Sequence, residues 1–316
     1  MIVKTNEMNM CKRKICQLVM MVSLLLSGVD AYAQLSGSYA VGSSGDYTTI
    51  GDAIIDINSQ GLSGDVTLRI NSGTYEEEVD LSNLNNGSFT LTLEGEDLEN
   101  TIISPTYEDV PLTAGFNLQS TDNVTIRNLR FDMQFELAVS GNSILGIYVE
   151  DASNILIENN MIGSLTGMAI EDGANIQVSN NIVVSEGVAL GVLNCNTLDV
   201  IHNTFHSKVI GIRNGTATGY FVITEGVSVF DGIIQNVRIM NNIFSGITPQ
   251  DSDGTAGISL GVDGSFLTTS TISNLTSDYN LFDADLGMAV LGLTGNTTID
   301  GDAVAGDFSL ADWNVV

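Results

Sequence analysis

A ten-residue phrase that recurs six times constrains the fold of this chain more than any other feature. Its copies are DNVTIRNLRF (122–131), SNILIENNMI (153–162), ANIQVSNNIV (174–183), NTLDVIHNTF (196–205), QNVRIMNNIF (235–244) and SNLTSDYNLF (273–282). Aligned on Asn128, successive copies are 31, 21, 22, 39 and 38 residues apart, so two short repeats are followed by longer ones with insertions. A period of this length is typical of a solenoid, in which each coil stacks on the previous one.

Three columns of apolar residues run through the copies and predict the inward side of each coil. Apolar residues two positions apart indicate a strand with one buried face, and parallel strands stack about 4.8 Å apart. A second apolar strand precedes the copies, as in Phe116–Leu118 and Ile147–Val149, so each coil needs at least two strands and two corners. The columns hold Val124, Ile155, Ile176, Leu198, Val237 and Leu275; then Ile126, Ile157, Val178, Val200, Ile239 and Ser277; then Phe131, Ile162, Val183, Phe205, Phe244 and Phe282. The sequence therefore predicts an all-β parallel helix of strands.

Two columns of asparagine flank the repeated strand. Asn tolerates left-handed backbone geometry and bonds its own backbone, which suits a tight bend, and stacked amides also bond along the axis. We therefore interpret both columns as turn-building rather than ligand-binding. The column after the strand holds Asn160, Asn181, Asn203, Asn242 and Asn280, and the column before it holds Asn123, Asn154, Asn175, Asn236 and Asn274, with Thr197 in the fourth copy.

A solenoid also needs a cover over its first apolar coil. Thr49 followed by Asp52 resembles a capping box, and four apolar residues between Ile50 and Ile57 fall on one helical face. The sequence predicts a short amphipathic helix, Thr49–Asn58, that closes the N-terminal end.

The stretch SSGDYTTIGDAIIDINSQGLSGDVTLRINSGTYEEEVDL (43–81) resembles the N-terminal segment of pectin lyase-like β-helix proteins, including pectinesterases. In those proteins a Gly-Asp-Tyr/Phe-Thr-Thr-Ile phrase leads into the capping helix, and a strand and a Gly-x-Tyr-x-Glu phrase follow, here Gly73–Glu77. The repeats extend the likeness over most of residues 43–282. The resemblance implies a single-stranded right-handed parallel β-helix with a short N-terminal capping helix, and it implies less about chemistry because one fold serves many activities.

The first residues are typical of a secretory signal peptide. A positive patch at Lys12–Lys14 precedes an apolar run, Ile15–Leu26, and a small-x-small cleavage signal, Ala31–Ala33. A single membrane anchor is the alternative, although the apolar run is short for a bilayer span. We expect residues 1–33 to be removed near Ala33–Gln34. The mature chain would then be secreted, extracellular or attached at the cell surface, with no membrane span.

We expect residues 34–316 to form one β-helix domain, with its cap at 43–60 and its coils at about 64–300. The phrases SDYNLFDA and FSLADWN resemble the last coil of bacterial extracellular β-helix regions, which usually continue further. The end at Val316 therefore suggests a truncated chain or a lower end that lacks a conventional cap. Cys195 is the one cysteine outside the signal segment, so the core rather than disulfides must stabilise the mature fold.

The charge balance limits the partners. The chain has 38 acidic and 10 basic residues, and 36 acidic and 6 basic residues remain without the first 33. The charge disfavours nucleic acid and anionic membranes as partners, because neutralising phosphate needs Lys and Arg. An anionic polysaccharide would need a bridging cation or a local basic spot, and divalent cations are natural companions of this surface. The simpler interpretation of the charge is solubility in a salty medium.

Pectinesterase chemistry, as the resemblance implies, uses two Asp and one Arg with a Gln lining the site. Gln250–Ser252 lacks the pattern around the family's Gln-Asp-Thr phrase, and Val229–Gly232 is only faintly like its Asp-Phe-Ile-Phe-Gly phrase. No Arg-Pro-Trp phrase exists, and the only Trp is Trp313. The sequence therefore disfavours an esterase. A lyase would instead need Ca²⁺ on carboxylates and an Arg or Lys base.

Few basic residues are available for such a role. We assign Arg127 and Arg238, with Glu158, to one outward repeat position, which is typical of a solvated face. Arg213 is the better candidate, because it falls with His202, His206 and Lys208 on one coil and its following turn. Arg213, His202 and His206 are therefore our weak catalytic candidates. For His202 we favour the alternative of a solvent-facing replacement of a turn Asn.

The most site-like acidic feature is a ladder on two coils. Glu150 and Asp151 occupy the same repeat positions as Glu171 and Asp172. Carboxylates on adjacent coils repel unless they are hydrated, protonated or bridged by a cation. An oxygen-rich cluster suits Ca²⁺ far better than zinc, so these four residues are candidate calcium ligands. The alternative, which we favour, is a hydrated acidic patch.

Three functions remain open. The first is a secreted or cell-surface β-helix that binds polysaccharide without catalysis, and the second is a polysaccharide-active lyase or hydrolase. The third is a structural or adhesive segment of a larger secreted protein. An enzyme should bring two or three carboxylates together with Arg213 or a His in a groove, whereas a binder should show exposed aromatic residues. Tyr220 and Phe221, in an inserted segment, are candidates for stacking on sugar rings.

Overall fold

The structure, a computed structural model, describes residues 34–106, 112–133, 143–185, 188–207, 227–230, 233–246, 258–260, 271–279, 281–282, 288–290, 297–299 and 302–304. Every helix and strand described below belongs to one compact unit, Leu35–Val316. The predicted signal segment, the inserted residues Tyr220 and Phe221, and the candidate Arg213 lie outside the described residues.

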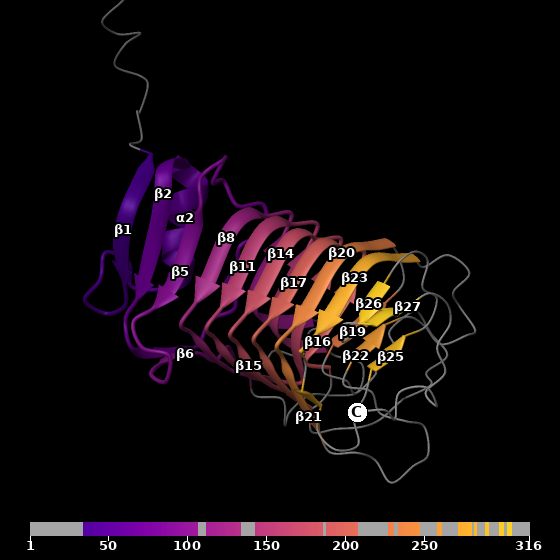
Figure 1. Ribbon diagram of the computed structural model, residues 1–316. Coiled ribbons are helices and arrows are strands. Elements are labelled where there is room, and N and C mark those ends of the chain that lie inside the picture. The colour runs from indigo at the N-terminus through magenta and orange to yellow at the C-terminus, as the bar shows by residue number, and fades with distance from the viewer. Residues whose placement is uncertain are drawn as a thin grey trace, which may run out of the picture. The chain divides into compact units, whose positions relative to one another are not determined.

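Each coil runs through three sheets in turn, which we call A, B and C (Figure 1). Sheet A contains β1 (Leu35–Val41), β2 (Leu62–Ile70), β5 (Leu91–Gly95), β8 (Asp122–Arg127), β11 (Ser153–Glu158), β14 (Ala174–Ser179), β17 (Asn196–Ile201), β20 (Ile233–Met240), β23 (Thr271–Asp278), β26 (Thr297–Ile299) and β27 (Asp302–Val304). All its neighbouring strands are parallel except β26 and β27, which are antiparallel.

Sheets B and C follow sheet A in every coil. Sheet B contains β3 (Gly73–Tyr75), β6 (Thr101–Ile103), β9 (Arg130–Asp132), β12 (Met161–Ser164), β15 (Ile182–Ser185), β18 (Thr204–Ser207), β21 (Ile243–Gly246) and β24 (Leu281–Phe282). Sheet C contains β4 (Val79–Asp80), β7 (Leu112–Gln119), β10 (Ser143–Glu150), β13 (Thr166–Glu171), β16 (Leu190–Leu193), β19 (Val227–Phe230), β22 (Ile258–Leu260) and β25 (Met288–Val290). The predicted all-β parallel helix is therefore confirmed, with one more strand in each coil than the predicted minimum.

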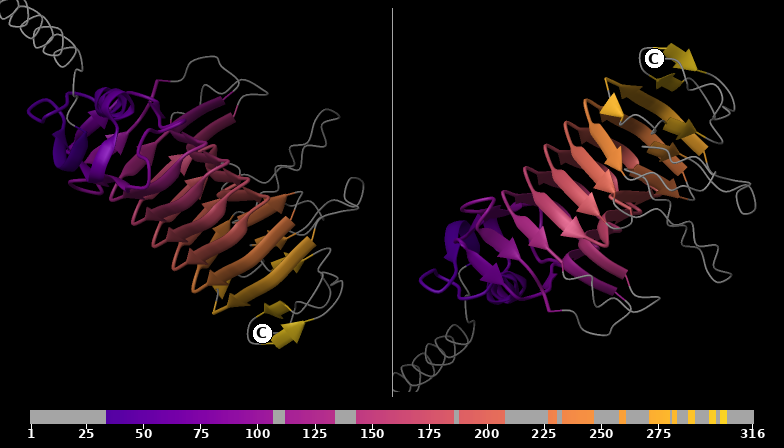
Figure 2. Two further views of the ribbon diagram at one scale, coloured as in Figure 1. Left: turned by 90° about the horizontal axis from the view of Figure 1, so that it is seen from above. Right: turned by 90° about the horizontal axis from the view of Figure 1, so that it is seen from below.

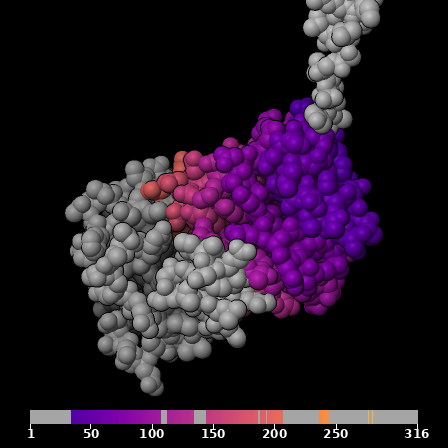
Figure 3. Space-filling model, turned by 180° about the vertical axis from the view of Figure 1, so that it is seen from behind, coloured from indigo at the N-terminus to yellow at the C-terminus, as the bar shows by residue number. Residues whose placement is uncertain are grey.

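The strand register confirms the apolar columns. Val124 pairs with Ile155, which pairs with Ile176, and the same column continues to Leu198 and Val237. These side chains are buried in one continuous core. In the core Phe116 of sheet C meets Phe131 of sheet B edge to face, with ring centroids 5.1 Å apart. The coils stack closely, as the space-filling view shows for the N-terminal part in indigo and purple (Figure 3).

The capping helix α2 (Ile50–Gln60) covers the N-terminal end of this core (Figure 2). The Thr49 hydroxyl accepts a hydrogen bond from the Asp52 amide at 3.0 Å, as the capping box predicted. Ile50, Ala53, Ile54 and Ile57 are buried, and α2 packs against β1, β2 and β4. The prediction is confirmed, and the helix extends two residues beyond the predicted end. Within the described ranges, no helix is long and apolar enough to cross a membrane.

The phrase Gly73–Glu77 fastens this helix to the first coil. The Glu77 carboxylate accepts hydrogen bonds from the amides of Ile50 and Gly51, both at 2.9 Å. The buried Tyr75 hydroxyl lies 3.2 Å from the carbonyl of Val41 and 2.9 Å from that of Asn71. A carboxylate at a helix N-terminus satisfies otherwise unpaired amides, so the motif has a structural role in this chain.

The asparagine column after the repeated strand has a different role from the one that the sequence predicted. The left-handed residue at the corner between sheets A and B is the one before the predicted position, with φ between 55° and 60° at Asn128, Asn159, Asn180, His202, Asn241 and Tyr279. The described members of the predicted column, Asn160, Asn181, Asn203 and Asn242, are instead buried and form an amide ladder. The Asn181 side chain accepts from the Asn160 amide nitrogen at 2.9 Å and donates to the Ile157 carbonyl at 2.9 Å. The column before the strand is left-handed as expected, as at Asn123, Asn154 and Asn175.

Candidate functional site

The two glutamates of the predicted acidic ladder lie side by side on the outer face of sheet C. Glu150 of β10 pairs in register with Glu171 of β13, and Gln119 of β7 pairs with Glu150 on the other side. Their neighbours Val149 and Ile170 are fully buried in the core, so the glutamates point outward. Both are only partly exposed. Three adjacent strands thus present an amide and two carboxyl groups in one row.

Tyr148 completes this cluster in the neighbouring outward position of β10. Its hydroxyl donates to Glu171 Oε2 at 3.3 Å, and Gln119 Nε2 donates to Glu150 Oε2. The tyrosine is 9% exposed and packs with Ala114 and Leu145 in a small apolar cluster separate from the main core. The glutamates therefore lie beside buried apolar surface rather than on an open, fully hydrated face.

Asn117 extends the row from Tyr148 toward β4. It pairs in register with Tyr148 and with Asp80, and its Nδ2 lies 3.4 Å from Asp80 Oδ1. Its Oδ1 is buried and has no hydrogen-bond partner among the described residues. A buried acceptor without a partner is costly, so this oxygen carries an unsatisfied hydrogen-bonding capacity beside the cluster.

The electrostatics of the cluster raise the pKa of Glu171 above its ordinary value. Burial raises the pKa of Glu171, the hydrogen bond from Tyr148 opposes that shift, and repulsion from Glu150 and Asp172 adds to it. Burial and the two glutamates also raise the pKa of Tyr148, so its hydroxyl stays a donor. A carboxyl group with a raised pKa beside a second carboxyl group is typical of sites that transfer protons.

The aspartates of the predicted ladder have a different environment. Asp151 and Asp172 lie at the corner after sheet C with φ of 48° and 51°, and both are exposed. Ser120 and Asn194 take the same left-handed conformation in the neighbouring coils, so this column builds the turn. In the described part of the chain, no group of three or more His, Cys, Asp or Glu is arranged to hold a metal. Calcium binding stays a prediction.

The histidines among the weak catalytic candidates lie on other sheets than this cluster, and Arg213 lies outside the described residues. His202 is the exposed left-handed residue between sheets A and B, which agrees with the favoured replacement of a turn Asn. His206 lies in β18 of sheet B, where it pairs in register with Val184 and Ser245. Sheets A and B are the other two sides of the coil from the glutamates on sheet C.

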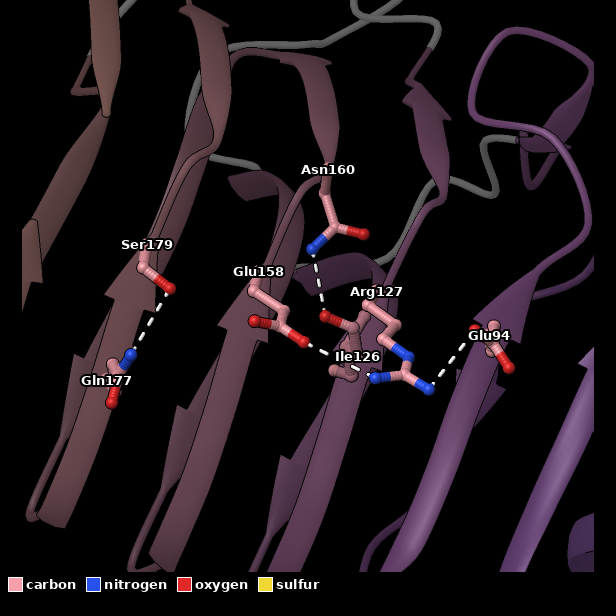
Figure 4. Close-up of polar contacts among 7 residues, drawn as sticks. All are labelled: Glu94, Ile126, Arg127, Glu158, Asn160, Gln177 and Ser179. Carbon is pink, nitrogen blue, oxygen red and sulfur yellow. Dashed lines mark hydrogen bonds and ion pairs between the residues drawn. The ribbon is translucent and has the colours of Figure 1, made fainter. Parts of the chain in front are cut away.

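Arg127 and Arg238 occupy different repeat positions, so their assignment to one position is wrong. Arg127 pairs in register with Glu158, whereas Arg238 lies one outward position earlier and pairs with Asp199. Arg127 bridges Glu94 at 3.1 Å and Glu158 at 3.6 Å across three strands of sheet A (Figure 4). Arg238 Nε donates to Asp199 Oδ1 at 2.6 Å. Both arginines are more than a third exposed, as a solvated face requires.

Sequence reasoning missed Tyr148 and Asn117 as members of the site. Each was treated only as the middle residue between two inward apolar residues, Ile147 and Val149 in one strand and Phe116 and Leu118 in the other. The available signal was their shared outward position, one column away from Gln119 and Glu150. Outward aromatic and amide residues beside outward carboxylates are a recognisable site pattern.

Comparisons with known proteins agree with this architecture. The model of the right-handed β-helix region matches residues 40–205 and, in a second match, residues 114–304. Probable pectinesterase A of Aspergillus flavus is 35% identical over 103 residues, which are 31% of this chain and 29% of that protein. The match therefore spans less than a third of the curated relative's length. The same-named protein of Aspergillus oryzae matches equally.

Solved structures are also similar to parts of this chain. The pectin methylesterase of Aspergillus niger is 18% identical, with 88% of this chain and 93% of that chain covered and a TM-score of 0.47. The Escherichia coli protein ybhC is 14% identical, with coverage of 81% and 75% and a TM-score of 0.49. The family matches run from residue 40 to residue 304, the stretch over which the three sheets are wound. This chain belongs to the family of proteins with a right-handed β-helix region.

Proposed function

We propose that this protein is a secreted or cell-surface polysaccharide-binding protein whose binding site is the outer face of sheet C. The observation that carries the proposal is the row formed by Asn117, Tyr148, Gln119, Glu150 and Glu171. It combines two partly exposed carboxyl groups, which can accept hydrogen bonds from sugar hydroxyls, with a tyrosine beside apolar surface. A few convergent polar groups on a partly apolar face are typical of ligand sites.

The charge of this face selects the kind of polysaccharide. None of the described arginines lies on sheet C, so nothing in this row offsets the two glutamates. Uronate carboxylates would be repelled unless Glu171 is protonated or a cation bridges the groups. A neutral or esterified polysaccharide is therefore the ligand class that fits.

Two further observations support the class and the location. The curated relatives that match are named as pectinesterases, which act on a polysaccharide. The predicted signal peptide at residues 1–33 would export the chain to where such polymers occur. N-terminal sequencing of protein recovered from the culture medium tests the export. We expect the secreted chain to begin near Gln34.

Calorimetric binding tests the site itself. Highly methyl-esterified pectin and de-esterified polygalacturonate are titrated into the wild type, Glu171→Gln, Tyr148→Phe and the control Glu158→Gln. Glu158 is a partly exposed outward residue of sheet A. Glu158→Gln therefore removes one negative charge from a different sheet than the proposed site. We expect the esterified polymer to bind more tightly, and the sheet C variants alone to lose affinity. An equal loss of affinity in Glu158→Gln, or no binding by the wild type, would contradict the proposal.

The Glu150–Glu171 pair favours a glycoside hydrolase as the second candidate. Parallel strands about 4.8 Å apart place register partners near the carboxyl separation of about 5–5.5 Å used by retaining enzymes. In such a reaction Glu171, with its raised pKa, would protonate the glycosidic oxygen while Glu150 attacks the anomeric carbon. Water would then release the sugar from Glu150. The assay is the release of reducing ends from the same polymers, which Glu150→Gln and Glu171→Gln must each abolish.

A further inference from the structure

A separate polar cleft lies at the N-terminal end, beside the start of α2. Its volume is about 480 Å³, within the range of about 300–1,000 Å³ that small-ligand sites occupy. Two segments line it, the loop from Gly42 to Thr49 and the stretch from Asn71 to Glu77. None of the residues of the sheet C row belongs to it.

Several polar side chains of this cleft are exposed and make no polar contact with the described residues. The hydroxyl groups of Ser43, Ser44, Thr48 and Thr74 and the carboxylate of Glu76 make no hydrogen bond or ion pair with the described residues. Ser43, Ser44, Thr48, Thr74 and Glu76 are all exposed. The cleft thus gathers donors and acceptors that are available to a ligand.

The walls that carry these groups are fixed by contacts outside the cleft. The amide and hydroxyl of Ser72 bond Glu96 Oε2 at 2.9 and 3.1 Å, and Glu77 is held by the first amides of α2. The lack of a side chain at Gly42 keeps this part of the cleft open. A Cβ there would lie 3.1 Å from both the Asn71 side-chain amide and the Tyr75 hydroxyl. A ligand would therefore find a site that needs little rearrangement to bind it.

Charge decides which class of ligand fits. The lining contains no Lys, Arg or His, and Glu77 already occupies the positive end of the helix dipole. Burial and the neighbouring Glu77 and Glu96 raise the pKa of Tyr75, as expected in a negative local potential. Anions such as uronates and phosphates are thus repelled. Metal binding is also disfavoured, because no three metal-ligating side chains of the described ranges converge here.

We propose that this cleft binds a neutral sugar unit of a glycan, through the hydroxyls of Ser44 and Thr74 and the carboxylate of Glu76. A neutral sugar offers many hydroxyl groups that both donate and accept, which matches a lining of hydroxyls and one free carboxylate. Hydrogen bonds to a charged acceptor are the stronger ones, so Glu76 orients the sugar. The site is independent of the polysaccharide face on sheet C.

The test titrates the full chain with neutral tetrasaccharides, namely cellotetraose, xylotetraose, mannotetraose and galactotetraose, and with tetragalacturonate, all in EDTA. The variants are Glu76→Gln and the double variant Ser44→Ala/Thr74→Ala. Glu99→Gln is the matched control, because Glu99 is exposed and lies outside the cleft. We expect at least one neutral tetrasaccharide to bind, at least fivefold weaker binding by both cleft variants, unchanged binding by the control and no binding of tetragalacturonate.

Failure of this inference is distinguishable from failure of the sheet C proposal. Because a neutral sugar also fits the face on sheet C, Glu171→Gln must leave unchanged the tetrasaccharide binding step that the cleft variants weaken. Thermal unfolding shows that the cleft variants remain folded. The inference is overturned if no neutral tetrasaccharide binds, or if the cleft variants bind as the wild type does. Loss of binding in Glu171→Gln alone would assign the sugar to sheet C and also overturn it.

Discussion

At the scale of single residues, the two asparagines at each corner have different tasks. The first, such as Asn180 with φ of 56°, turns the chain, and the second, such as Asn181, bonds buried backbone and amide groups. The repeat alone predicted that both columns are structural. It could not predict which asparagine faces inward, because a left-handed residue breaks the alternation on which a strand pattern depends.

Replacing these neighbours separately tests the division. Asn181→Ala removes bonds to the Ile157 carbonyl and to Asn160 and Asn203 inside the core, so we expect a loss of about 3 kcal/mol in unfolding free energy. Asn180→Ala only places alanine in left-handed geometry, which costs about 1 kcal/mol. Denaturant unfolding of both variants measures the difference. Equal losses would show that the buried ladder adds nothing beyond the turn.

Two substitutions beside Glu171 should shift its pKa in opposite directions. Tyr148→Phe removes the hydrogen bond that lowers the pKa of Glu171, so this pKa should rise further. Glu150→Gln removes a repelling charge, so the pKa of Glu171 should fall. Carboxyl NMR titration of the two variants measures both shifts. Shifts in the same direction would contradict the arrangement of the three groups.

The same shift has a consequence for stability. Because the pKa of Glu171 is higher in the folded protein than in the unfolded chain, folding takes up a proton between the two values. The contribution of this group to stability is fully present below the unfolded pKa and is lost as the pH rises through the folded pKa. Glu171→Gln should therefore weaken the decline in stability across that window, as denaturant unfolding at a series of pH values would show.

At the scale of elements, carboxylates accept hydrogen bonds from backbone amides that have no partner within the regular sheet or helix. Glu77 receives the first amides of α2, Glu78 receives the Ala114 amide at 3.0 Å, and Asp122 receives the Ser153 amide at 2.8 Å. Acidic residues of this protein thus also act as acceptors for backbone amides. The helix itself was predictable from local pattern, whereas the partner of its N-terminus lies 26 and 27 residues along the chain and was not.

Two adjacent glutamates provide a matched test of this element. Glu77→Ala removes both bonds to the helix start, and we expect a loss of about 2 kcal/mol in stability. Glu76→Ala removes an exposed carboxylate without such bonds, so stability should change little. Thermal unfolding of both proteins compares them. A larger loss in Glu76→Ala would contradict the role assigned to Glu77.

At the scale of the whole molecule, the core is continuous, and Cys195 is one of its buried residues. This thiol is fully buried, and burial raises its pKa to about 12. In a Cys11→Ser/Cys16→Ser chain, Cys195 should therefore resist an aromatic disulfide reagent at neutral pH and react fully in denaturant. Rapid reaction of the native protein would show that the coils around it open.

The site was only partly predictable at this scale. The repeat placed Glu150 beside Glu171, and the register confirms it. The separation of Asp151 and Asp172 from them could not follow from sequence, because adjacent residues at a strand end diverge once the second turns left-handed. The burial of Tyr148 beside Leu145 and Ala114 depends on packing outside the core, which a repeat pattern does not specify.

The most direct measurement for the proposed polysaccharide face is the carboxyl NMR titration of Glu171 and Glu158 with and without saturating methyl-esterified oligogalacturonate. A ligand on sheet C removes more water from Glu171, so its pKa, already raised by burial, should rise further. The carboxyl resonance of Glu158 on sheet A should not move when the ligand binds. An unchanged Glu171 with bound ligand, or a shift confined to Glu158, would contradict the assignment of the binding site to sheet C.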